Sequence, residues 1–74
     1  MEKKIQEIWK EILQLDIEPQ TDESFFDLGG NSYHAATAAQ RIEEETGKHI
    51  EVSDFYEYDT IEAIVKLLGE SGEN

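Results

Sequence analysis

One serine stands where its hydroxyl group could do chemistry. Ser32 follows the glycine pair Gly29-Gly30 and Asn31, and a helical pattern begins at or next to it. The unpaired amides of a helix N-terminus and the positive end of the helix dipole favour an anion at such a place. Ser32 is therefore a candidate helix cap, phosphate anchor or nucleophile, and the choice among these roles decides what the chain does.

Two enzyme-like interpretations of Ser32 fail on spacing. A hydrolase elbow requires glycine two residues after the serine, on a turn between a strand and a helix. Here that position is His34, and no strand pattern precedes the loop. A nucleotide-binding loop requires a lysine directly before its serine or threonine, and Asn31 occupies that place. No metal site is predicted either, because the chain has no cysteine and its two histidines, His34 and His49, have no partner at ligand spacing.

Charge restricts the partners of the chain. Eighteen acidic residues against six basic ones give a net charge of −12. This argues against nucleic acid, since phosphate contacts need clustered lysine and arginine. It favours basic protein partners or serves solubility alone. No apolar run is long enough to cross a membrane, and the N-terminus lacks the apolar region of a signal peptide. The expectation is a soluble cytoplasmic protein.

Apolar spacing predicts an all-α chain with helices near residues 2–15, 32–46, 54–57 and 61–68. The i, i+3, i+4, i+7 pattern is strongest in the first of these, where Trp9 lies on the apolar face. Gly47 is the predicted left-handed residue that ends the second helix, and Thr60 is the predicted cap of the last. We therefore expect one domain over residues 1–74, a small four-helix bundle with a short third helix, in which residues 70–74 form a frayed tail.

A long loop separates the first two helices. Pro19 forbids a helix through the residue before it. A loop of this length must be pinned to the domain or it stays mobile. Phe25, Phe26 and Leu28 are the predicted pins, because they are large apolar groups in a polar segment. On the second helix, Tyr33, Ala36 and Thr37 begin a weakly apolar stripe beside Ser32, which is either a docking surface or a cover for this loop.

The segment Phe25-Phe26-Asp27-Leu28-Gly29-Gly30-Asn31-Ser32 resembles the attachment motif of carrier domains, in particular the peptidyl carrier (thiolation) domains of nonribosomal peptide synthetases in the acyl carrier protein superfamily. Residues 55–61 are similar to the second landmark of that family, which leads into its last helix. The resemblance implies the acyl-carrier type of four-helix bundle. It also implies that a phosphopantetheinyl transferase, using magnesium, moves 4′-phosphopantetheine from coenzyme A to the Ser32 hydroxyl. The thiol of this arm would hold an aminoacyl, peptidyl or related acyl thioester, so that a chain without cysteine takes part in thiol chemistry.

The resemblance further implies a non-catalytic carrier that is itself a substrate. Residues of the loop around Ser32 would shape the attachment site: Asp27, Leu28, Gly29, Gly30 and Asn31. The glycines would let a transferase approach the serine closely. Tyr33, Ala36 and Thr37, with Phe55 or Tyr56, would form the partner surface. The partners would be the transferase, an adenylation or other loading enzyme, and condensation, tailoring or thioesterase domains, all acting on a monomer.

Some positions depart from the family pattern. Tyr33 stands where the family usually has Leu, Ile or Met, and Asp59 replaces a common proline before Thr60. These departures concern the identity of the partners, while the attachment motif is complete. A polyketide-type or stand-alone acyl carrier remains an alternative. The alternative from another class is a helical interaction module without a cofactor, in which Ser32 is only a helix cap.

Overall fold

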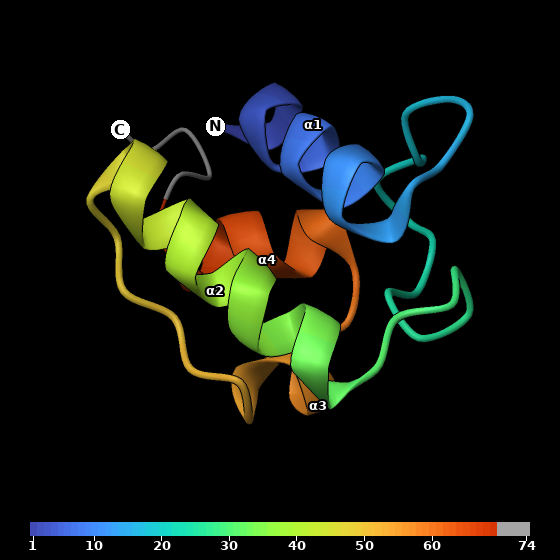
Figure 1. Ribbon diagram of the computed structural model, residues 1–74. Coiled ribbons are helices and arrows are strands. Elements are labelled where there is room, and N and C mark those ends of the chain that lie inside the picture. Colours follow the sequence, from blue (N-terminus) through green and yellow to red (C-terminus); the bar gives the residue numbers. More distant parts are fainter. Residues whose placement is uncertain (70–74) are drawn as a thin grey trace.

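The computed structural model describes residues 1–69, which form four α-helices and no strand. The helices are α1 (Glu2–Leu13), α2 (Ser32–Thr46), α3 (Asp54–Glu57) and α4 (Ile61–Leu67) (Figure 1). The predicted all-α class and the long loop between the first two helices are confirmed. The frayed tail predicted over residues 70–74 lies outside the described residues. No helix within residues 1–69 is long and apolar enough to span a bilayer.

Two predicted helix ends are wrong by one or two residues. The first helix ends at Leu13 rather than at residue 15, because Gln14 adopts left-handed backbone angles (φ 56°, ψ 48°). This turn lets the amide of Leu15 donate to the Lys10 carbonyl at 2.9 Å. The last helix ends at Leu67, and Leu68 is its C-cap. The predicted bounds of the second and third helices agree with the structure, and Gly47 ends α2 with φ 75°.

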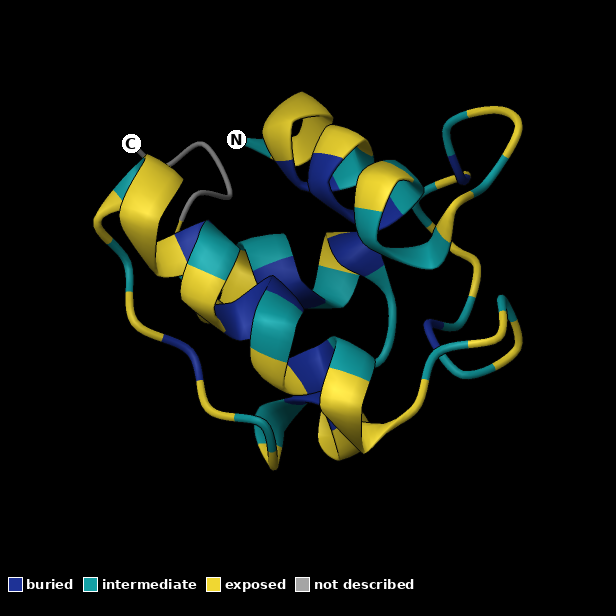
Figure 2. Ribbon diagram, viewed as in Figure 1, coloured by how far each residue is buried: buried dark blue, intermediate teal, exposed yellow. Residues whose placement is uncertain are grey.

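The core lies between α1, α2 and α4, and α1 contacts both of the other helices. Figure 2 shows the buried parts of these helices on the sides that face one another. Trp9 is completely buried, with its ring centroid 4.8 Å from that of Phe25 and 6.4 Å from that of Phe55. Its indole N–H has no acceptor within the described residues, so Trp9 stabilises the fold through apolar burial and ring contacts. Small residues of α2, Ala35 and Ala38, are also completely buried.

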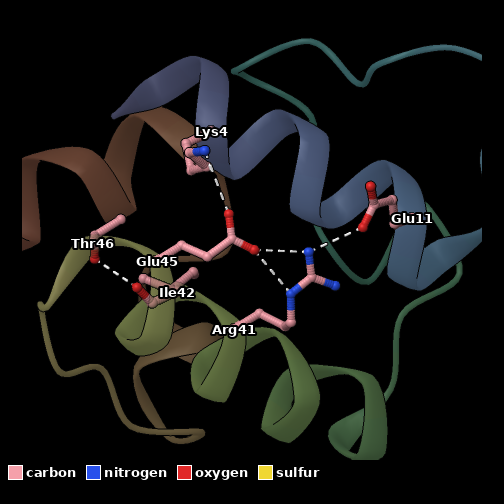
Figure 3. Close-up of polar contacts among 6 residues, drawn as sticks. All are labelled: Lys4, Glu11, Arg41, Ile42, Glu45 and Thr46. Carbon is pink, nitrogen blue, oxygen red and sulfur yellow. Dashed lines mark hydrogen bonds and ion pairs between the residues drawn. The ribbon is translucent and has the colours of Figure 1, made fainter.

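An ion-pair network joins α1 to α2 on the surface (Figure 3). The Arg41 guanidinium donates to Glu11 of α1 at 3.0 Å and to Glu45 of α2 at 2.8 Å. Lys4 of α1 lies 3.5 Å from Glu45. The hydrogen bond from Arg41 holds the pKa of Glu45 below its usual value. Because these groups are largely exposed, the network adds little to the stability that the core provides.

Hydrogen bonds attach the long loop to the segment between α3 and α4. The Phe25 amide donates to the Asp59 carbonyl, and the Ser24 hydroxyl donates to the Asp59 carboxylate, both at 2.7 Å. Nearby, the Glu62 amide donates to the Thr21 carbonyl at 3.1 Å. The loop is thus held by polar contacts as well as by its apolar pins. Of those pins, Phe25 is completely buried, and Phe26 and Leu28 are partly buried against the core.

Candidate functional site

Asn31, and not Ser32, closes the first turn of α2. Asn31 has extended backbone angles (φ −135°, ψ −173°), and its Oδ1 accepts the His34 amide at 3.0 Å. In return, the Asn31 amide donates to Nδ1 of His34 at 3.2 Å. The two hydrogen bonds form a capping box. The interpretation of Ser32 as a helix cap is therefore wrong, because Ser32 is the first residue of the helix and its hydroxyl is not needed to close it.

The polar groups around Ser32 are available to an incoming group. Ser32 is exposed, and its hydroxyl has no hydrogen-bond partner within residues 1–69. Within the same residues, the amides of Ser32 and Tyr33 have no acceptor, because the helical hydrogen bonds begin with the Ala35 amide on the Asn31 carbonyl. The first turn of α2 carries no acidic residue, although the chain has a net charge of −12. Free amides at a helix N-terminus and a first turn without acidic residues suit a phosphate ester on Ser32.

The two glycines before Asn31 have different roles. Gly29 has φ 100°, a left-handed conformation that favours glycine, and an added Cβ would meet nothing within 4 Å. Gly30 packs on Phe25, where an added Cβ would lie 2.6 Å from ring atom Cδ2 and 2.9 Å from the carbonyl oxygen. The Gly30 amide also donates to that oxygen at 3.1 Å. Gly29 is therefore required by its backbone conformation, while Gly30 is required by the packing of the loop itself.

The other predicted loop residues lie around this turn without forming a catalytic arrangement. Leu28 is partly buried against the core, and its amide donates to the Ser24 carbonyl at 3.1 Å. Asp27 is exposed, and within residues 1–69 its carboxylate has no hydrogen-bond partner. Leu28 thus takes part in the packing and hydrogen bonding of the loop, whereas nothing in the described part of the chain joins the Asp27 carboxylate to the Ser32 hydroxyl.

The predicted partner surface needs one correction. Tyr33 is 76% exposed and Tyr56 is 61% exposed, whereas Phe55 is 0% exposed. Phe55 packs against Phe25 with ring centroids 5.0 Å apart, so it belongs to the core and cannot meet a partner. Its neighbour Tyr56 stacks on Phe26 of the loop at 4.9 Å with 17° between the ring planes. Phe26, predicted only as a pin, thus contributes to the surface that includes Tyr56.

On α2, Ala36 is exposed and Thr37 is partly buried. The Thr37 hydroxyl donates to the Tyr33 carbonyl at 3.2 Å, so its one O–H donor is used within the helix. The surface beside Ser32 therefore consists of an aromatic ring, a methyl group and the outer side of a threonine. Such a surface can bury apolar area against another protein, while the Tyr33 hydroxyl remains available for a hydrogen bond to that partner.

The histidines have local partners. His34 completes the capping box, and His49 lies between two carboxylates, with Nε2 2.7 Å from Glu51 and Nδ1 3.1 Å from Glu43. The hydrogen bonds to Glu51 and then to Glu43 raise the pKa of His49 above its ordinary value. Among residues 1–69, no group of three or more His, Asp or Glu side chains is arranged to hold a metal ion.

Sequence reasoning missed the role of His34 because its position in a capping box is normally held by Glu or Gln. It also treated the aspartate at position 59 only as a departure from the family, although its carboxylate accepts the Ser24 hydroxyl. A short polar residue opposite another polar loop residue gives no periodic signal, so only the folded structure brings the two together.

Comparison with known proteins agrees with this geometry. Residues 3–68 match the model of the phosphopantetheine attachment site family. The chain is 40% identical over 75 residues to surfactin synthase subunit 3 of Bacillus subtilis, covering 97% of this chain and 6% of that protein. It is 35% identical over 68 residues to the polyketide synthase PksN of the same organism, covering 92% of this chain and 1% of that protein. The chain therefore spans a small part of the curated relatives that it matches.

A solved structure with the same fold is BlmI, a type-II acyl carrier protein from Streptomyces verticillus involved in bleomycin biosynthesis. It superimposes with a TM-score of 0.81 and 32% sequence identity, covering 89% of this chain and 78% of BlmI. The chain thus belongs to the phosphopantetheine attachment site family, and it is a carrier domain with the fold of an acyl carrier protein. Domains of this family carry a covalent phosphopantetheine arm.

Proposed function

We propose that Ser32 is the residue of this chain that carries the 4′-phosphopantetheine arm. The observation that supports this most directly is its exposed hydroxyl, which has no partner within residues 1–69 and stands at the first position of α2. In the proposed transfer, the Ser32 oxygen attacks the phosphorus of coenzyme A that bears the pantetheine. A new P–O bond forms, the bond to the adenosine bisphosphate leaving group breaks, and the serine proton passes to a base of the transferase.

The residues of the chain hold the modified serine in place. The free amides of Ser32 and Tyr33 are suited to face the phosphodiester oxygens. The capping box fixes the backbone before Ser32, and Gly30 holds the loop on the Phe25 ring. The bound arm supplies a terminal thiol that carries an acyl group as a thioester. The chain itself contributes position and no reacting side chain other than the Ser32 hydroxyl.

We further propose that residues 1–74 act as one peptidyl carrier domain in nonribosomal peptide assembly. The similarity to surfactin synthase subunit 3 supports this choice, and the similarity to PksN keeps a polyketide-type carrier as the second candidate. The proposed partners are a phosphopantetheinyl transferase, a loading enzyme, and condensation, tailoring or thioesterase domains, which act on a monomer. Because the donor is coenzyme A, the modification is proposed to take place in the cytoplasm.

The proposed partner surface is formed by exposed groups near the start of α2 and by an aromatic pair. Tyr33, Ala36 and Thr37 supply the first part, and Tyr56 with Phe26 supplies the second. Large aromatic side chains that are exposed in the free protein are the groups that gain most from burial at an interface.

Intact-mass spectrometry tests the attachment site. The chain is incubated with coenzyme A, magnesium and a broad-specificity transferase, in parallel with Ser32→Ala and Ser53→Ala. Ser53 is the matched control, because it is also exposed at a helix start and makes no side-chain capping bond. We expect one added phosphopantetheine on the wild type and on Ser53→Ala, and none on Ser32→Ala. A folded wild type that gains no mass would overturn the proposal in favour of a cofactor-free interaction module.

A further inference from the structure

Residues 24–30 of the long loop form a turn that is closed by its own backbone hydrogen bonds, and we call it the attachment turn. Three amides in its second half donate to carbonyls in its first half, each at 3.1 Å: Leu28 to Ser24, Gly29 to Phe26, and Gly30 to Phe25. Asn31 follows directly and belongs to the capping box of α2. Because Ser32 comes only two residues after the turn, a displacement of the turn changes the backbone that an enzyme meets beside the serine hydroxyl.

Both hydrogen bonds that join the attachment turn to other segments of residues 1–69 go to Asp59. Its carbonyl accepts the Phe25 amide at 2.7 Å. Its carboxylate accepts the Ser24 hydroxyl at 2.7 Å, in a partly buried contact. A proline, which the family commonly has at this position, would offer the carbonyl but no carboxylate, so the second bond depends on the aspartate of this chain.

The two residues that Asp59 binds are also the ones that hold the far side of the turn. The Ser24 carbonyl accepts the Leu28 amide, and the Phe25 carbonyl accepts the Gly30 amide. Gly30 in addition packs on the buried ring of Phe25. Loss of the contacts to Asp59 would therefore loosen the whole turn up to the residue before Asn31, while no hydrogen bond joins Asp59 to the Ser32 hydroxyl.

We propose that Asp59 is a positioning residue for transfer of the arm: its carbonyl and carboxylate hold the attachment turn, so that the backbone before Ser32 already has the conformation that the transferase requires. This inference rests on the proposed attachment at Ser32. Misplacement of a reacting group by about 1 Å can cost on the order of 100-fold in rate. Because Asp59 acts through the turn and lies outside the proposed partner surface, its loss should lower kcat and leave KM unchanged.

Three substitutions test the bond between the Ser24 hydroxyl and the Asp59 carboxylate. Asp59→Ala and Ser24→Ala remove it from either end, and both leave the backbone bond from Phe25 in place. Asp59→Asn keeps an acceptor oxygen for the serine hydroxyl. Transfer to each apo protein is followed by intact mass over a range of carrier concentrations, which gives kcat and KM separately.

Two further variants serve as matched controls. Glu62→Ala removes another carboxylate that contacts the loop, but its partner, the Thr21 hydroxyl at 3.5 Å, lies outside the attachment turn. Ile5→Val removes one buried methyl group from α1, which lowers stability about as much as the loss of one hydrogen bond. The first controls for charge, and the second controls for stability.

We expect kcat of Asp59→Ala and of Ser24→Ala to fall by about threefold to tenfold, and the double variant to be no slower than either. Asp59→Asn, Glu62→Ala and Ile5→Val should stay within about twofold of the wild type. The inference is overturned if the two alanine variants also stay within that range, if Asp59→Asn is as slow as Asp59→Ala, or if Ile5→Val loses as much.

Hydrogen exchange of the Gly30 amide in the apo protein, followed by nuclear magnetic resonance, gives a readout that is independent of transfer. In Asp59→Ala and Ser24→Ala this amide should exchange about fivefold faster, the factor that a hydrogen bond of ordinary strength is worth. Amides in the middle of α2, which report opening of the whole domain, should change less. An equal increase throughout the chain would overturn the inference, because the bond would then serve overall stability alone. A wild type that accepts no arm would refute the proposed function, and this inference with it.

Discussion

Replacement of Gly30 by alanine is expected to destabilise the domain, because the added Cβ would overlap with Phe25. The new Cβ would lie 2.6 Å from Cδ2 and 2.9 Å from the carbonyl oxygen of Phe25. The Phe25 ring cannot retreat, since it is completely buried and packs edge-on against Trp9 and Phe55. The loop itself must move, at a cost of about 1–3 kcal/mol for overpacking. Loss of the hydrogen bond from the Gly30 amide would add about 1 kcal/mol. The sum is about 2–4 kcal/mol, a large part of the roughly 4–11 kcal/mol typical of a domain this size.

Urea unfolding measures this cost, with the single tryptophan, the buried Trp9, as the fluorescent probe. Gly29→Ala is the matched control: its Cβ meets nothing, and only the left-handed backbone conformation costs about 1–2 kcal/mol. In a Phe25→Leu background, which removes the outer ring atoms, the cost of Gly30→Ala should fall by at least about 1 kcal/mol. The reasoning is refuted if Gly30→Ala costs no more than Gly29→Ala, or if its cost is unchanged in the Phe25→Leu background.

Three further predictions concern polar contacts. In a double-mutant cycle by urea unfolding, Ser24→Ala and Asp59→Ala should be coupled by about 1 kcal/mol through their partly buried 2.7 Å hydrogen bond, and strict additivity would contradict this. Hydrogen bonds to two carboxylates raise the pKa of His49 above its ordinary value of 6.5. At a pH below 6.5, His49→Gln should therefore unfold at a lower urea concentration than the wild type. This difference should fade as the pH rises through the folded pKa, because a neutral ring can donate to only one carboxylate; a constant difference would count against it. Arg41→Met should cost about 0.5–1 kcal/mol at low salt and less in about 1 M salt, and a salt-independent loss would rule out the ion pairs as its cause.

The spacing of apolar residues and the residues that start or end helices predict most of the fold. The apolar spacing in residues 2–13 and 32–46 is strong, and Gly47 and Thr60 mark a helix end and a helix start by backbone chemistry that acts locally. The end of α1 was not predictable in this way. Gln14 takes a left-handed conformation that glycine or asparagine would signal in a sequence, and a glutamine at that place gives no such signal.

The local structure around Ser32 is less predictable from the sequence than its position at a helix start. Because serine is a strong capping residue, the sequence leaves a helix cap open as one of the roles of Ser32. The structure gives this role to Asn31, with His34 as its partner. Burial of Phe55 was missed for a related reason. In a helix of four residues, Asp54–Glu57, no period exists that would tell the inward aromatic residue from the outward one.

Three contacts together constrain the backbone just before Ser32. The Asp59 carbonyl fixes Phe25, the Phe25 ring fixes Gly30, and the capping box fixes Asn31. None of them involves the Ser32 hydroxyl, which has no hydrogen-bond partner within the described residues. Ser32→Ala should therefore abolish modification without lowering stability, because alanine removes the proposed acceptor of the arm and leaves the cap intact. At Gly30 any side chain displaces the loop, so a substitution there should change both the stability of the domain and its modification. A rigid frame around a hydroxyl that has no structural task is what a carrier needs, because the same serine must be presented to a transferase and then hold an arm that visits other enzymes.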